Sequence, residues 1–80
     1  MPTSTPDRAT RIRSAEALGR AIRASRTRAG MTQAELAERA RANRYAIHTL
    51  ESGHETRAIE LLFETLAALG LELTIRQRQE

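Results

Sequence analysis

The stretch that decides the fold is GMTQAELAERARANRYAIHTLESG, residues 30–53 of the 80-residue chain. Within it, Thr32 and Glu35 have the spacing of a capping box. In that motif the threonine oxygen accepts a hydrogen bond from the amide three residues on, and the glutamate side chain accepts one from the threonine amide. A helix is therefore predicted to begin at Gln33. Its apolar residues share one helical face, and they are Leu36, Ala37 and Ala40.

A second short helix follows. The apolar pattern breaks at residues 41–43 and resumes with Ile47 and Leu50 before Ser52-Gly53 ends it. Two helices of about eight residues, joined by about three, are unstable alone and keep their shape only when packed across each other. Because Ala37 is small, it lets the two backbones cross closely. The arrangement predicted is a helix-turn-helix.

The flanking segments supply two more helices and a strand. Ser14 is a candidate N-cap for a helix that reaches Ala29, and Thr56 caps a further helix that Gly70 ends. Leu71 to Ile75 then alternates apolar and polar residues, which is typical of a half-buried strand. The predicted fold class is all-α, a compact domain of four to five helices with one short C-terminal β-strand.

The apolar core predicted from the composition is thin. Leu, Ile and Phe number 15 of 80 residues, Val is absent, and nine of the fifteen lie between Ile59 and Ile75. A lone strand leaves its amides and carbonyls unpaired. Antiparallel pairing with the same strand of a second chain would pair these backbone groups and would also cover the apolar residues gathered at this end. A C2 homodimer is therefore predicted. Its dimerisation residues are Leu71, Leu73 and Ile75, packed on Leu66 and Leu69.

Charge and composition narrow the function classes. The chain has no cysteine, which excludes disulfides and thiol catalysis. It has no apolar run near the ~20 residues of a membrane span and no secretory leader in its first 14 residues, and we expect a soluble, cytoplasmic protein. Residues 1–44 carry ten Arg against four acidic residues, net +6, whereas residues 45–80 are net −3. A basic half is either a solvated surface or the footprint of a nucleic-acid binder.

The motif residues resemble a known family. The run from Gly30 to Ala37, then Ile47 and the run from Leu50 to Gly53, is similar to the helix-turn-helix of Xre and Cro/C1-type repressors. With the strand included, the chain looks most like HipB-type antitoxins, dimeric repressors whose partner toxin is a HipA-like Ser/Thr kinase. Taken together, the composition, the patterns and the resemblance divide the chain into a flexible tail (1–14), a DNA-binding domain (15–70), a dimerisation strand (71–76) and a tail (77–80).

The resemblance also implies which residues contact operator DNA. They are Gln33, Arg41, Asn43, Arg44, Tyr45, His48 and Thr49. The second helix of the motif enters the major groove, where Arg44 can bond both O6 and N7 of guanine or instead contact phosphate. Tyr45 can contact a thymine methyl or a phosphate, or pack against the preceding helix. Gln33 stands at a helix N-terminus, where free amides favour a phosphate oxygen.

Two further positions are singled out for structural reasons. Arg41 occupies a turn position that relatives usually fill with glycine, and a left-handed conformation there costs on the order of 1 kcal/mol. Arg26 and Glu51 match a pair that forms a shielded ion pair in relatives. The alternative is that Arg26 and Glu51 do not pair and that each charge is solvated by water.

Rival functions are a generic Xre-type regulator without a toxin and a pure protein-interaction module. An enzyme would need His48, Glu51 and His54 as a metal site, or His48 with Ser52 as a nucleophile pair, and a core this small leaves no room for a large pocket. We therefore expect no catalysis, no metal, no cofactor and no small-molecule substrate.

Overall fold

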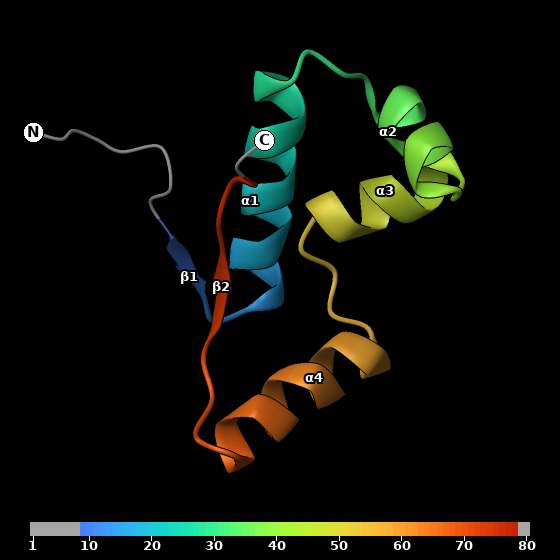
Figure 1. Cartoon of the computed structure of the whole chain (residues 1–80). Coiled ribbons are helices and arrows are strands. Elements are labelled where there is room, and N and C mark those ends of the chain that lie inside the picture. Colours follow the sequence, from blue (N-terminus) through green and yellow to red (C-terminus); the bar gives the residue numbers. More distant parts are fainter. Residues whose placement is uncertain (1–8, 79–80) are drawn as a thin grey trace, which may run out of the picture.

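The structure, a computed structural model, describes residues 9–78. These residues form four helices and a two-stranded sheet (Figure 1). In chain order the elements are β1 (Thr10–Ile12), α1 (Ala15–Arg28), α2 (Gln33–Ala40), α3 (Arg44–Glu51), α4 (Arg57–Ala68) and β2 (Leu73–Ile75). The chain is mostly helical, as predicted, and none of the helices in residues 9–78 is long and apolar enough to cross a membrane.

Each helix begins at a polar residue whose side-chain oxygen accepts a hydrogen bond from an amide of the first turn. These residues are Ser14, Thr32, Asn43 and Thr56. The capping box is complete, because Thr32 Oγ1 accepts from the Glu35 amide at 3.0 Å and Glu35 Oε1 accepts from the Thr32 amide at 2.8 Å. The predicted caps at Ser14, Thr32 and Thr56 are confirmed.

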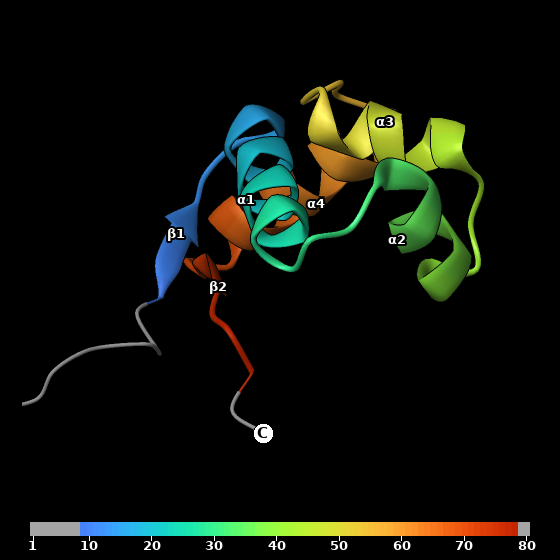
Figure 2. The same cartoon turned by 90° about the horizontal axis from the view of Figure 1, so that it is seen from above.

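The first three helices pack closely around a small core. α1 crosses the end of α3 at Gly19, where a Cβ would lie 2.6 Å from the carbonyl oxygens of Leu50 and Glu51. Only glycine permits that approach. Ala37 of α2 and Ile47 of α3 are 3% and 4% exposed, which confirms the prediction of a small buried residue at Ala37. Figure 2, which looks down on the molecule, shows α4 lying behind α1 and α3.

The prediction of a single strand is wrong. β1 pairs antiparallel with β2, in the register Thr10 opposite Ile75 and Ile12 opposite Leu73. Ile12, which the sequence assigned to a flexible tail, is 3% exposed and belongs to the core. Sequence periodicity missed β1 because it offers one large apolar residue and finds its partner about sixty residues away. Residues 1–8 and 79–80 of the two predicted tails lie outside the described residues.

The strand pairing removes the premise on which a strand-to-strand dimer was predicted. One edge of β2 is already paired within the chain, so the strand is not an orphan. Leu66 lines a groove together with Leu71 and Leu73, as expected for a strand packed on α4. Leu69 does not join them, because it is 66% exposed.

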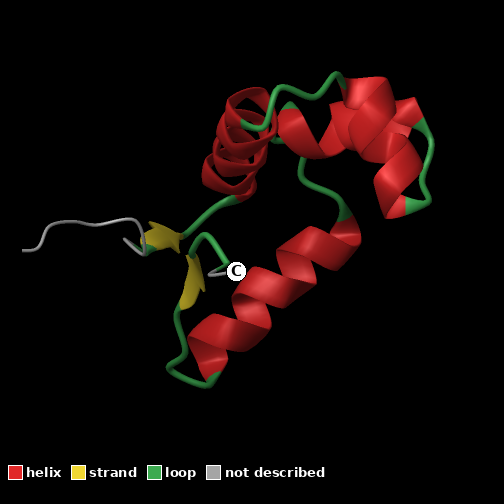
Figure 3. Ribbon diagram, turned by 45° about the horizontal axis from the view of Figure 1, so that its top comes forward, coloured by secondary structure: helices red, strands yellow, loops and turns green. Residues whose placement is uncertain are grey.

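α4 is the least buried helix, since none of its residues is buried. Figure 3 shows it running along the bottom of the molecule with the ribbon of β1 and β2 at its C-terminal end. Its half-buried apolar residues recur at steps of four and three, and they are Ile59, Phe63 and Leu66. Phe63 and Leu66 line the groove that also includes Leu73.

Candidate nucleic-acid interface

The outward face of α3 holds the residues predicted to contact DNA. Arg44, Tyr45 and His48 are exposed, and Thr49 is half-buried beside them. At 3.6 residues per turn these four positions cover a single arc of the helix, opposite the buried Ile47. Tyr45 is 76% exposed, so its predicted alternative of packing against the preceding helix is wrong.

α3 is held firmly at both ends. At its start, Asn43 Oδ1 accepts a hydrogen bond from the Ala46 amide at 2.8 Å. At its end, the carbonyls of Leu50 and Glu51 lie against Gly19 of α1. The oxygen of Asn43, a predicted DNA contact, is therefore engaged as a helix cap, and its amide group is the part that could donate to a phosphate.

The predicted ion pair between Arg26 and Glu51 is present. Arg26 Nε lies 2.5 Å from Glu51 Oε2, and Arg26 Nη2 lies 3.0 Å from Glu51 Oε1. The two side chains are 14% and 4% exposed, and Arg26 also donates to the Met31 carbonyl at 2.8 Å. This bidentate pair ties α1 to the end of α3 and to the loop before α2.

The ion pair changes the acid–base properties of both groups. Hydrogen bonds from Arg26 hold the pKa of the Glu51 carboxyl below its ordinary value, and this lowering outweighs the effect of burial, which raises it. A further hydrogen bond from Gln33 lowers the Glu51 pKa as well. The same contact with Glu51 raises the pKa of Arg26. Both groups are therefore charged at neutral pH.

Gln33 is less available to DNA than the sequence indicated. Its side-chain Nε2 donates to Glu51 Oε1 at 3.1 Å, so part of its hydrogen-bonding capacity is used inside the domain. The backbone amides of Gln33 and Ala34 open α2 and have no acceptor within the helix. These two amides, more than the Gln33 side chain, are what the N-terminus of α2 offers to a phosphate.

A hollow of about 420 Å³ lies between α1, the start of α2 and α3. Its lining residues are Arg23, Arg26, Gln33, His48, Glu51 and Ser52. Arg23 is exposed, and its charge helps to lower the pKa of Glu51. Sequence reasoning missed Arg23, although its spacing of three residues from Arg26 on one helix was a usable signal.

Arg41, at the turn position that relatives usually fill with glycine, adopts the left-handed conformation, with φ 60° and ψ 43°. It ends α2, and its amide bonds the carbonyls of Ala37 and Glu38. The side chain is exposed. Arg41 therefore stands in the turn between α2 and α3, two residues before the Asn43 cap of α3.

The structure does not gather the residues of the enzyme alternative into a metal site. Within residues 9–78, no three His, Asp or Glu side chains form a group that could hold a metal ion. Glu51, which that site would need, is engaged by Arg26 and Gln33.

Comparison with known proteins finds no matching family model, no matching curated protein and no matching solved structure.

Proposed function

We propose that the protein is a sequence-specific DNA-binding transcriptional repressor that acts as a homodimer. In this proposal α3 enters the major groove of operator DNA and presents Arg44, Tyr45, His48 and Thr49 to base edges and groove walls. Arg44 is the residue for direct readout, through a bidentate contact with guanine.

The observation that carries the proposal is the outward face of α3. A helix of only eight residues, fixed at both ends, exposes an arginine, a tyrosine and a histidine side by side. A tyrosine left 76% exposed on a rigid helix has no packing role within the described residues. Rigid presentation of such side chains is what base readout needs.

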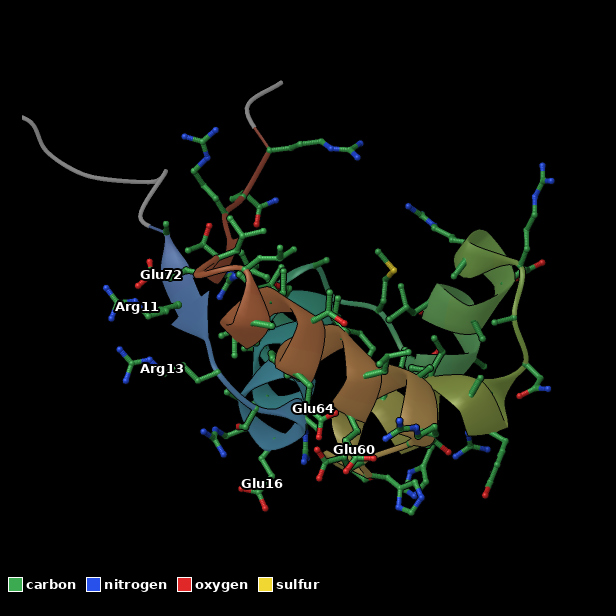
Figure 4. The ribbon with its side chains drawn as sticks, turned by 90° about the horizontal axis from the view of Figure 1, so that it is seen from below. Arg11, Arg13, Glu16, Glu60, Glu64 and Glu72 are labelled. Carbon is green, nitrogen blue, oxygen red and sulfur yellow. The ribbon has the colours of Figure 1, made fainter. Side chains whose placement is uncertain are left out.

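Phosphate contacts come from the groups that surround this face. Arg23, Arg41 and the two free amides of α2 lie around the same helix, so they can fix the register of the protein on the duplex without reading sequence. The acidic half of the chain includes Glu60 and Glu64, which Figure 4 shows side by side on α4, a different helix from the one that carries this face.

A homodimer would place two copies of α3 about 34 Å apart, one turn of DNA, on an inverted-repeat operator. β2 keeps one edge that is unpaired within residues 9–78. Pairing of Leu71, Leu73 and Ile75 with their twins through that edge therefore stays a prediction.

The biological setting that we propose is a toxin–antitoxin operon, with a kinase-like toxin as the protein partner and the cytoplasm as the location. This part rests on the sequence resemblance to HipB-type antitoxins. The alternative is a generic Xre-type regulator without a toxin. Co-purification of a kinase-like protein encoded beside this gene would favour the antitoxin.

Binding to random DNA tests the proposal first. We expect the purified protein to bind a random duplex at low salt and to lose affinity as salt rises, because phosphate contacts release counterions. Selection from a random library should then enrich an inverted repeat. No binding to random duplex at low salt would favour the third class, a protein-interaction module.

A further inference from the structure

The hollow between α1, the start of α2 and α3 is lined by two basic side chains that form no ion pair within residues 9–78. Arg26 and Gln33 both donate to Glu51 there, and the charges of Arg26 and Glu51 cancel. Three ion pairs lie within residues 9–78, and neither Arg23 nor His48 belongs to any of them. Both side chains are exposed. They are therefore the groups that the hollow can offer to an anion.

His48 differs from the rest of the outward face of α3 because it also lines this hollow. Arg44, Tyr45 and Thr49 are not among the lining residues, whereas His48 shares the hollow with Arg23 of α1. When a helix lies in the major groove, the groups that flank it are the phosphates of the two backbones. An anion that reaches the hollow from bound DNA is therefore a backbone phosphate.

We infer that the hollow holds one phosphate of the DNA backbone between Arg23 and His48, and that protonation of His48 strengthens this contact. The inference rests on the proposed function, and it assigns His48 to a groove wall instead of a base edge. The lining residues carry a net charge of +1 from Arg23 while His48 is neutral, and +2 when its imidazole is protonated. A charged donor makes a shorter and stronger hydrogen bond to a phosphate oxygen than a neutral donor does.

Of the residues that line the hollow, His48 is the one whose charge changes between about pH 8 and 5.5. A histidine ordinarily gains its proton in this range, and arginines stay charged throughout it. The carboxyl of Glu51 stays ionised because its pKa lies below the ordinary value, and the lining residue from α2 is the uncharged Gln33. Because a bound phosphate favours the protonated imidazole, protons favour bound DNA by the same factor. Affinity for DNA should therefore rise as the pH falls.

The affinity for a random duplex at two pH values tests the inference, because a phosphate contact needs no particular sequence. At about 0.1 M salt we expect the wild-type chain to bind about five- to tenfold more tightly at pH 5.5 than at pH 8, for each bound chain. The slope of log affinity against log salt should steepen by about 0.9 for each bound chain, since one more phosphate is neutralised. His48→Gln should lose both effects. His54→Gln is the control, because His54 lies in the loop before α4 and does not line the hollow.

Two further variants test the charge and the partner of His48. His48→Lys carries a permanent charge, so it should bind at pH 8 about as tightly as the wild-type chain binds at pH 5.5. Arg23→Gln should weaken binding severalfold at both pH values. Arg20→Gln is its control, because Arg20 is exposed one turn earlier on α1 and does not line the hollow, and it should weaken binding less. Circular dichroism at both pH values checks that each variant keeps its helices.

The outcomes separate this inference from the proposed function. DNA binding with the same pH and salt dependence in the wild type and His48→Gln would overturn the inference and leave the proposed function standing. An equal loss of affinity at both pH values in His48→Gln would make His48 an uncharged contact, which also overturns it. Unchanged affinity in Arg23→Gln would show that the phosphate is not held in the hollow. A wild-type chain that binds no duplex at either pH would overturn the proposed function and the inference together.

Discussion

Replacing Glu51 with alanine should destabilise the domain by about 3 kcal/mol. The Glu51 carboxylate accepts three hydrogen bonds, two from Arg26 and one from Gln33, and its side chain is 4% exposed. Glu51→Ala removes the acceptor for all three and leaves a shielded guanidinium without its counter-charge. Breaking a buried pair by removing one partner costs about 3 to 5 kcal/mol, and the lower end applies because Arg26 keeps some contact with water.

That loss is a large part of the total stability. A chain of this size has an unfolding free energy of roughly 4 to 12 kcal/mol, and so the midpoint of thermal unfolding should fall by about 12 to 24 °C. Urea and thermal unfolding followed by circular dichroism at pH 7 measure both quantities. Glu64→Ala is the control, because Glu64 is exposed, and its unfolding free energy should change by less than about 0.5 kcal/mol. A loss below about 1 kcal/mol in Glu51→Ala would show that the pair does not tie α1 to α3 as described.

Three further predictions concern stability. Folding lowers the pKa of Glu51, so the contribution of its charge to stability is complete above the ordinary pKa of 4.5 and is lost as the pH falls through the lower folded value. The difference in unfolding free energy between wild type and Glu51→Gln should therefore be constant from pH 7 to 5 and should narrow below pH 4.5. A difference that widens in acid would contradict the cause given for the lowered pKa. Arg41→Gly should stabilise the domain by about 0.5 to 1 kcal/mol, because glycine adopts the left-handed conformation without strain. Arg39→Gly, inside α2, should instead destabilise it by about 1 kcal/mol. Denaturant unfolding that ranks the two variants in the opposite order would refute the strain at Arg41. Ile12→Ala should lower the unfolding free energy by about 2 to 4 kcal/mol, because Ile12 is 3% exposed. Arg11→Ala, on the same strand, should lower it by less than about 1 kcal/mol. Equal unfolding midpoints for the two variants would mean that β1 does not belong to the core.

Local sequence signals predicted the helices well. Ser14, Thr32 and Thr56 mark helix starts because a cap needs only a side-chain oxygen and amides within three residues. The capping box depends on the same short range. The pair of Arg26 and Glu51 joins more distant residues, and it was the resemblance that indicated it.

The misses are contacts that local patterns do not encode. β1 has three residues, and Ile12 becomes a core residue only after the chain has brought Leu73 beside it. The engagement of Gln33 by Glu51 depends on how the end of α3 meets the start of α2. The apolar residues of α4 recur at helical spacing, yet the structure leaves Phe63 half-buried and Leu62 and Leu69 exposed. A hydrophobic pattern reports which residues avoid water, but it does not report which neighbour covers them.

The most direct test of the central claim is the effect of Arg44→Ala on two affinities measured at one salt concentration, for the duplex enriched by selection and for a random duplex. Base readout by α3 predicts that the selected site loses about 1 to 3 kcal/mol, with relaxed preference at one base pair, while random-duplex affinity changes much less. Tyr45→Phe in the same assay shows whether the neighbouring hydroxyl contributes. An equal loss for both duplexes would make Arg44 a phosphate contact and would contradict the account of α3 as the helix that reads sequence.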